Sequence, residues 1–348
     1  MTRTTLPRCS ATTSRSRNSD MRILATGVTG QAGYYLARHA ASQGHEVHGL
    51  ARPGSVATAE AMLGTSTLGA SGVRIHAGDV RDQGVLDAVV AAVRPERVFH
   101  FAAGVSVAAS WEDPVGHADV NALGTARLLE AVRAHAPQAR FFYASSSEAL
   151  GRAASMTEVF DERSPLRPAT PYGVSKAFGH HLVRAYRDRY GMFAVCGVMF
   201  NIESPVGVRA SVVQHVAASM VRIAEGRQAV SIEIGNLDAQ RDWGFAGDYV
   251  EAAALMLEQP EPDDLVIATG VVHTVRDLVA SAASAAGIAV PALQVSEDRL
   301  RPGEVNRIAA DPSLIRARLG WSARTDLDGL LRIIVSDPAF RARALAGG

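Results

Sequence analysis

The chain has 348 residues, and its 35 acidic and 35 basic side chains give a formal net charge of zero at pH 7. This balance argues against a nucleic acid or an anionic membrane as the main partner, because both attract strongly basic surfaces. No apolar run approaches the roughly 20 residues that a membrane-spanning helix needs. The two cysteines, Cys9 and Cys196, lack the spacing of a metal site and cannot form a disulfide framework, so we expect no metal and a cytoplasmic location.

The first 20 residues differ in composition from the rest of the chain. They are rich in Ser, Thr and Arg and contain almost no large apolar side chain. Such a segment cannot bury enough apolar surface to offset the entropy cost of ordering. We therefore expect a disordered N-terminal extension over residues 1–20, with a transit peptide as the alternative; the segment lacks the apolar core of a signal peptide.

From residue 21 onward, short apolar runs alternate with helical patterns. Helices are predicted for residues 31–43, 82–93, 114–134 and 171–190. Strands are predicted for Arg22–Thr26, Glu46–Leu50, Val73–His76, Arg97–Phe101, Arg140–Ala144 and Phe193–Met199. Repeated strand–helix–strand units indicate a parallel sheet with helices on both faces. The right-handed crossover rule then predicts an α/β fold with a Rossmann-type, doubly wound sheet.

The pattern becomes less regular after residue 200. The remaining candidates are the strands Val230–Ile234 and Leu265–Ala268 and helices over 211–225, 248–258, 274–286 and 326–335. We therefore divide the chain into a Rossmann domain over 21–200, expected to bind a cofactor, and a smaller α/β domain over 201–348, expected to bind the substrate. The second domain is expected to be partly interleaved with the first.

Three glycines directly follow the first predicted strand and open the first predicted helix. Gly27, Gly30 and Gly33 have the spacing G-x-x-G-x-x-G in this context. Glycines let the backbone turn tightly and approach a pyrophosphate, which binds where unpaired N–H groups and the helix dipole favour negative charge. The segment therefore predicts a dinucleotide-binding turn, with a purely structural turn as the alternative.

Residues at the ends of the next strands indicate which dinucleotide binds. The second strand leads into Arg52, at a place where NAD-specific proteins usually have an acid for the ribose 2′-hydroxyl. Because arginine suits a 2′-phosphate, NADP is favoured over NAD. Asp79 and Val80 follow the third strand and are expected beside the adenine. The fourth strand ends along the expected dinucleotide path with Phe101, Ala102 and Ala103.

Tyr172 and Lys176 are four residues apart on the predicted helix 171–190 and so share one helix face. A tyrosine that acts as a base must lose its proton near neutral pH, although its pKa in solution is about 10. A lysine ammonium and a positively charged nicotinamide both favour the tyrosinate. We therefore expect Tyr172 to be a catalytic base and Lys176 to support it, with both residues touching the cofactor.

The segment FFYASSSEALG ends the fifth predicted strand and adds two candidate catalytic residues. Ser146 can hydrogen-bond the reacting hydroxyl. Glu148 lies two residues later, at the carboxyl-end crevice of the sheet, and is interpreted as a general base rather than as an ordinary polar residue at a strand end.

These segments resemble the extended short-chain dehydrogenase/reductase superfamily and, within it, the GDP-mannose 4,6-dehydratases. The resemblance covers nearly all of Met21–Phe340 and rests on TGVTGQAGYYL, MFNIESP, GNLDAQRDWGFAGDYVEA, VIATGVVHTVRDLV and RPGEVNRIAADPSLIRARLGW. It implies a Rossmann-type fold, an NADP cofactor, a GDP-sugar substrate and a homodimer or homotetramer.

The resemblance also implies roles for individual residues. Thr29 and Gln31 would belong to the cofactor turn. By the resemblance, Arg241, Arg301 and Glu304 would hold the nucleotide diphosphate and ribose. This is chemically reasonable, because arginines suit phosphate oxygens and a carboxylate suits ribose hydroxyls. The residues implied to bind substrate are Ser147, Asn201, Glu203, Arg241, Arg301 and Glu304.

The chain departs from the family pattern around the expected sugar pocket. Gly104-Val105-Ser106 stands where the family usually has Gln-Ser-His, and Val206-Gly207-Val208 where it has Arg-Arg-Gly. Gln214-His215 replaces a basic pair, and Ala149-Leu150-Gly151 follows Glu148 in place of a segment with tyrosine. Ser146 replaces the usual threonine and retains the hydroxyl. These departures therefore bear on which sugar binds and, to a lesser degree, on which reaction follows, and not on the cofactor turn.

The leading hypothesis is a redox-neutral 4,6-dehydratase of a GDP-hexose such as GDP-mannose, in which NADP is recycled internally. The alternative is a 4-epimerase of a GDP-hexose or GDP-heptose, which would not need Glu148. A non-catalytic cofactor-binding sensor is a third hypothesis, which Ser146, Tyr172 and Lys176 disfavour. The helix that contains Tyr172 has enough apolar surface for two faces, which favours a dimer.

Overall fold

The computed structural model describes residues 21–64, 72–151, 153, 155, 157–207, 211–296 and 307–346. The predicted N-terminal extension and two predicted substrate-binding residues, Arg301 and Glu304, therefore lie outside the described residues. Within the described ranges, no helix is both long enough and apolar enough to cross a membrane.

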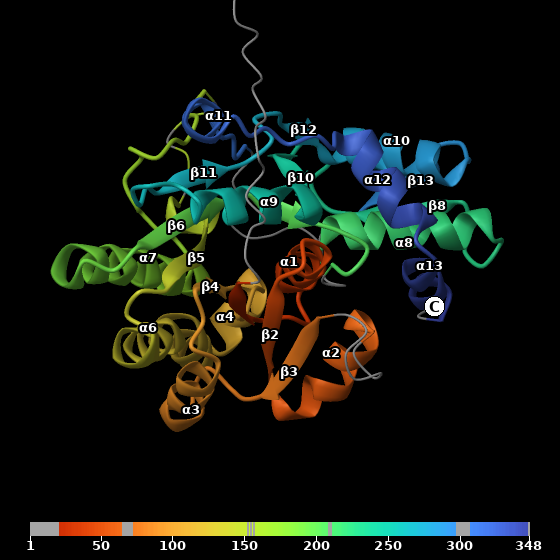
Figure 1. The fold of residues 1–348 in the computed structure, drawn as a ribbon. Helices are drawn as coiled ribbons and strands as arrows, with labels where there is room; N and C mark the ends of the chain where they lie inside the picture. The colour runs from red at the N-terminus through yellow and green to blue at the C-terminus, as the bar shows by residue number, and fades with distance from the viewer. Residues whose placement is uncertain are drawn as a thin grey trace, which may run out of the picture.

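A seven-stranded sheet forms the centre of the molecule, and all of its neighbouring strands run parallel (Figure 1). The strand order is β11-β6-β5-β4-β1-β2-β3. The strands are β1 (Arg22–Thr26), β2 (Glu46–Ala51), β3 (Val73–Ala77), β4 (Arg97–His100), β5 (Arg140–Ser146), β6 (Ala194–Met199) and β11 (Leu265–Ile267). The order of the first six strands is that of a doubly wound sheet, so the predicted Rossmann-type fold is confirmed.

Helices cover both faces of this sheet, which explains why central strands such as β1, β5 and β6 are buried along nearly their whole length. Two apolar clusters, one on each face, join the helices to the strands. One cluster includes residues of α1 (Gln31–Ser42), α2 (Val56–Leu63), α9 (Ala246–Met256) and α11 (Ser313–Leu319). The other includes residues of α3 (Gln83–Val93), α6 (Gly124–His135) and α7 (Pro171–Tyr190).

The later part of the chain has a separate apolar cluster. Its elements are α8 (Val212–Ala224), α10 (Val275–Ala286), α12 (Leu327–Ser336), α13 (Pro338–Ala346) and the parallel pair β8 (Ser231–Ile234) and β13 (Ala292–Val295). Two further small pairings are β7 (Asn201–Glu203) with β10 (Trp243–Phe245), and β9 (Gln240–Arg241) with β12 (His273–Thr274). These elements gather to one side of the large sheet, at the right of the view in Figure 1.

Two features differ from the sequence-based description. Strand β11, which we assigned to the later part, pairs with β6 and extends the large sheet, and α9 packs against α1. The predicted helix 114–134 is interrupted: α5 (Pro114–Ala118) leads into a π-helical turn over Asp119–Leu123 before α6 begins. The chain thus crosses between the two parts more than once, and the boundary at residue 200 stays a prediction.

Candidate active site

The glycine turn between β1 and α1 has the close approaches that its spacing predicts. Gly27 has a φ of +73°, and a Cβ there would lie 2.7 Å from the backbone nitrogen of Ala102. A Cβ at Gly33 would lie only 2.3 Å from the carbonyl oxygen of Gly27. Both contacts are with backbone, which cannot move aside, so larger side chains are excluded at these two positions.

The N-terminus of α1 suits an anion. Its N-cap is Gly30, which offers no side chain to cap the helix, and the first turn contains no acidic residue. The first intrahelical bond runs from the N–H of Tyr34 to the carbonyl of Gly30 at 2.9 Å. The earlier N–H groups point out of the helix, and together with the dipole they favour a phosphate. These residues therefore fit the pyrophosphate of a dinucleotide.

The expected adenine side contains an ion pair that the sequence did not reveal. Arg81 donates to both carboxylate oxygens of Asp79, at 3.0 and 2.8 Å, and this hydrogen bonding lowers the pKa of Asp79. Arg52 is exposed at the end of β2 and contributes a smaller lowering of the same pKa, so it lies near. The side chain of Val80 is buried and lies close to Gly124, and its position beside the adenine stays a prediction. This edge therefore has two arginines around one carboxylate.

Ser146 and Tyr172 come together at the carboxyl end of β5. The Ser146 hydroxyl hydrogen-bonds the Tyr172 phenol and accepts the N–H of Glu148 at 3.2 Å. Burial raises the pKa of Tyr172 to about 12; the Ser146 bond opposes this shift, and the Glu148 charge adds to it. The predicted residues Ser146, Glu148 and Tyr172 are therefore neighbours in the structure, although their catalytic roles are proposals.

Lys176 lies on the same face of α7 and is 96% buried, with a relative exposure of 4%. Burial lowers its pKa to about 8. Its ammonium lies 4.8 Å from the centre of the Tyr143 ring, a cation–π contact that favours the charged form. The causes that shift the pKa of Tyr172 are burial, the Ser146 hydrogen bond and the Glu148 charge, and support of Tyr172 by the Lys176 charge stays a prediction.

A buried network fixes the backbone around Tyr172, and sequence spacing did not predict it. Asn121, in the π-helical turn, accepts the Gly104 N–H at 2.8 Å and donates to the Gly104 carbonyl and the Ser175 hydroxyl, both at 3.0 Å. Ser175 donates to the carbonyl of Tyr172 at 2.7 Å. The side-chain amide of Asn121 thus contacts both the segment that follows β4 and helix α7.

The same network determines the tautomer of His100, which is buried. Thr125 donates its hydroxyl to the Asn121 carbonyl at 2.6 Å, so it must accept from His100 Nε2 at 3.1 Å. Thr26 accepts the N–H of Ala102 at 3.1 Å and donates to His100 Nδ1 at 2.8 Å. Burial, with a smaller effect of the Lys176 charge, lowers the pKa of His100 to about 3, so the imidazole is neutral with its proton on Nε2.

The predicted substrate-binding residues differ in exposure. Ser147 is buried after β5, and Asn201 is exposed at the start of β7. Arg241 is partly buried in β9 and donates to the Gln240 carbonyl at 2.8 Å. Glu203 is 5% exposed, and burial raises its pKa to about 8, while hydrogen bonds from Ser211 and Gln214 oppose this shift.

Gln31 follows the glycine turn directly, but its side chain contacts the substrate-side segment. Its amide nitrogen donates to the carbonyl of Ile202 at 2.6 Å, and its amide oxygen accepts the hydroxyl of Ser204 at 2.9 Å. Both ends of the amide are therefore used, which leaves the backbone of Gln31, not its side chain, for the cofactor turn.

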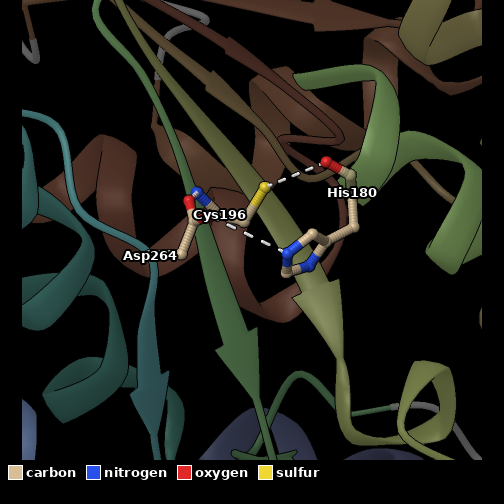
Figure 2. A group of neighbouring side chains, drawn as sticks. All are labelled: His180, Cys196 and Asp264. Carbon is tan, nitrogen blue, oxygen red and sulfur yellow. Dashed lines mark hydrogen bonds and ion pairs between the residues drawn. The ribbon is translucent and has the colours of Figure 1, made fainter. Parts of the chain in front are cut away.

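A second polar cluster includes His180, eight residues after Tyr172 on α7, and Figure 2 shows its three residues, His180, Cys196 and Asp264. Among the described residues this is the group whose ligand atoms could converge on a metal ion, within 4.8 Å of one another. However, Arg187 donates to both oxygens of Asp264 at 3.0 and 2.9 Å, and the Cys196 N–H adds a third bond. Burial raises the pKa of the Cys196 thiol. The cluster has the character of a structural ion pair.

Comparison with known proteins identifies relatives over the full length of this fold. The family model described as GDP-mannose 4,6 dehydratase matches residues 24–334. GDP-mannose 4,6 dehydratase 1 of Arabidopsis thaliana is 35% identical, with 96% of each chain covered. The GDP-mannose 4,6-dehydratase of Vibrio cholerae serotype O1 is 34% identical, with 93% of this chain and 95% of the relative covered.

Solved structures with the same fold include several epimerases. A UDP-glucose 4-epimerase from Thermus thermophilus in complex with NAD has a TM-score of 0.76 and 29% identity, covering 92% of this chain and 99% of that chain. A putative epimerase from Burkholderia cenocepacia has a TM-score of 0.79 and 26% identity, covering 92% and 98%. The predicted family resemblance is confirmed: the chain belongs to the GDP-mannose 4,6-dehydratase family, whose members are NAD(P)-dependent nucleotide-sugar enzymes of the extended short-chain dehydrogenase/reductase type.

Proposed function

We propose that the protein is a 4,6-dehydratase of a GDP-hexose such as GDP-mannose, with NADP as a recycled cofactor. The observation that supports this reaction most directly is the position of Glu148. Its charge is close enough to raise the pKa of Tyr172, so a carboxylate lies beside the tyrosine and serine expected to act at C4. Only a reaction with a second proton transfer needs such a carboxylate.

The chain's own residues can perform the proton transfers of this reaction. Tyr172 would accept the proton of the C4 hydroxyl, which Ser146 orients through its own hydrogen bond. The C4 ketone acidifies the C5 position, and Glu148 would remove the C5 proton as hydroxide leaves C6. The proton released from the C4 hydroxyl completes the water, and Glu148 would return its own proton to C5. A dinucleotide whose pyrophosphate is held by the glycine turn and the N-terminus of α1 would supply the hydride chemistry, and the overall reaction would be redox-neutral.

Support for the cofactor and substrate comes from the site and from the relatives. The uncapped N-terminus of α1 and the two arginines near Asp79 favour a dinucleotide with a 2′-phosphate. The relatives from Arabidopsis thaliana and Vibrio cholerae are both described as GDP-mannose dehydratases. The Thermus thermophilus structure contains NAD, which remains the alternative cofactor.

A 4-epimerase is the second candidate, because Val105 stands 50% exposed at the expected sugar pocket and several neighbours are described as epimerases. Incubation with GDP-mannose and NADP⁺ followed by mass spectrometry separates the two reactions. A product lighter by one water supports the dehydratase. An unchanged mass with altered sugar stereochemistry would support the epimerase and reject the dehydratase.

We also propose that the protein forms at least a homodimer through one apolar face. Helix α4 (Val107–Glu112) and α5 both pack against α7. Large apolar side chains of these helices are exposed: Trp111 is 64% exposed, Val115 79% and Phe178 44%. An apolar surface of this kind favours a protein partner, and a second copy can bury it symmetrically.

The cytoplasmic location likewise stays a proposal, which cell fractionation would test.

A further inference from the structure

The side chain of Gln31 links the first helix to the segment expected to face the substrate. It begins α1, where the pyrophosphate is expected, yet its amide contacts residues 202 and 204. The orientation of the amide follows from its partners, because the Ile202 carbonyl can only accept and the Gln31 nitrogen can only donate. Reversing the amide would place two oxygens together, so the link has one stable arrangement.

The link continues from this segment into helix α8. The amide nitrogen of Gln214 donates to the carbonyl of Ser204 at 2.9 Å. The carboxyl of Glu203 is buried in the same segment, where Ser211 and Gln214 oppose the rise of its pKa. A Cβ at Gly207 would lie 2.6 Å from the Gln214 amide nitrogen, so the segment passes closely over the helix. A continuous set of hydrogen bonds therefore connects the start of α1, the segment 201–204 and the start of α8.

We propose that Gln31 is a positioning residue that couples dinucleotide binding to nucleotide-sugar binding, a step that rests on the proposed function. An anion held by the first N–H groups of α1 fixes the start of that helix. The two bonds of Gln31 then fix the segment 201–204 in the same arrangement, so less ordering remains for the second ligand. Linkage requires the effect to be equal in both directions: NADP⁺ tightens GDP binding by the factor by which GDP tightens NADP⁺ binding.

The test measures GDP affinity by calorimetry with and without saturating NADP⁺. We expect wild-type protein to bind GDP at least about 5-fold more tightly with NADP⁺, the lower end of common coupling factors. Gln31→Leu should bring this factor close to one. Ser204→Ala removes the hydroxyl partner from the other side and should reduce the factor, and the two changes together should do no more than Gln31→Leu alone.

The matched control is Gln43→Leu, the same substitution at the exposed C-terminal end of α1. It should retain the full coupling factor. Equal factors in wild type and Gln31→Leu would overturn the inference while leaving the proposed function intact, as would a wild type that binds both ligands independently. Failure of wild-type protein to bind GDP or NADP⁺ at all would reject both. If Gln31→Leu does not fold, an unchanged factor in Ser204→Ala overturns the inference.

Discussion

Burial moves the pKa values of Tyr172 and Lys176 towards their neutral forms, up to about 12 and down to about 8. At neutral pH the tyrosine is therefore a phenol, whereas catalysis needs the phenolate. Moving its pKa from about 12 to near 7 requires about 7 kcal/mol of differential stabilisation, at 1.36 kcal/mol per unit. The positive charge of an oxidised nicotinamide is the additional group that would favour the phenolate.

The role of Glu148 is tested by Glu148→Gln, which keeps the size of the side chain and removes its basicity. For a dehydratase, hydride transfer from C4 should continue while loss of water falls by about 10²–10⁴-fold, the usual contribution of a positioned acid–base group. The reduced cofactor should then accumulate, as measured by absorbance. Tyr172→Phe is the control, since it should block the first oxidation and give no such signal. Unchanged turnover in Glu148→Gln would make the carboxylate a bystander.

The preference for NADP depends on the arginines near Asp79. We expect wild-type protein to bind NADP⁺ more tightly than NAD⁺, because guanidinium groups recognise a 2′-phosphate. Arg52→Ala and Arg81→Ala should each reduce the ratio of the two affinities, measured by calorimetry. Arg38→Ala removes an exposed arginine on α1 and should leave the ratio unchanged. Equal affinities in wild-type protein would contradict the assignment.

Buried neutral histidines make stability depend on pH. Burial lowers the pKa to about 3 for His100 and to about 4 for His180, below the value of about 6.5 in an unfolded chain. The unfolded state therefore binds more protons below pH 6.5, and the free energy of unfolding should fall with decreasing pH, by up to roughly 1.4 kcal/mol per pH unit per histidine. Urea unfolding at pH 7, 6 and 5 measures this slope. His100→Leu should make the slope shallower; an identical slope would show that other groups cause it.

At the scale of elements, the π-helical turn is the feature with most consequence for the site. Asn121 belongs to this turn and bonds both Gly104 and Ser175. The predicted regular helix over 114–134 gave no indication of these bonds. Asn121→Leu would leave buried partners at both ends without a bond, each costing about 1–3 kcal/mol. We expect a lower free energy of unfolding in urea together with a reduced kcat, because Ser175 no longer holds the Tyr172 carbonyl firmly. A stability loss with unchanged kcat would limit Asn121 to a structural role.

The elements that the sequence predicted well are those with a strong local pattern. The six early strands are short runs rich in apolar residues between helical patterns, and α7 has the predicted bounds because Thr170 caps it and Gly191 ends it. The pairing of β11 with β6 was not predicted, since sheet order depends on contacts distant in sequence. The short helix α4 is only six residues long, which is too short for a clear period.

The same distinction holds within the site. Ser146, Glu148 and Tyr172 were predicted because their spacing follows a strand end and a helix face. The ion pair of Arg81 with Asp79 and the bonds of Asn121 needed side-chain geometry. Gln31 was assigned to the cofactor turn by the family resemblance, and only the contacts of its side chain with Ile202 and Ser204 show that this side chain faces the segment 201–204.

At the scale of the whole molecule, the exposed apolar face of α4, α5 and α7 predicts self-association. Leaving such side chains in water costs roughly 25 cal/mol per Å² of apolar area, and a symmetric partner removes this cost from both copies. We expect wild-type protein to be at least a dimer by light scattering at micromolar concentration.

Phe178→Glu tests this face directly. A charge introduced into an apolar interface would appear twice in a symmetric dimer, so both desolvation and like-charge repulsion oppose assembly. The mass from light scattering should fall towards that of one chain, while the free energy of unfolding of the monomer changes little because Phe178 is half exposed. Val290→Glu introduces the same charge at an exposed valine outside these helices and should leave the mass unaltered. A monomeric wild type, or a Phe178→Glu variant with the wild-type mass, would show that copies do not meet through this face.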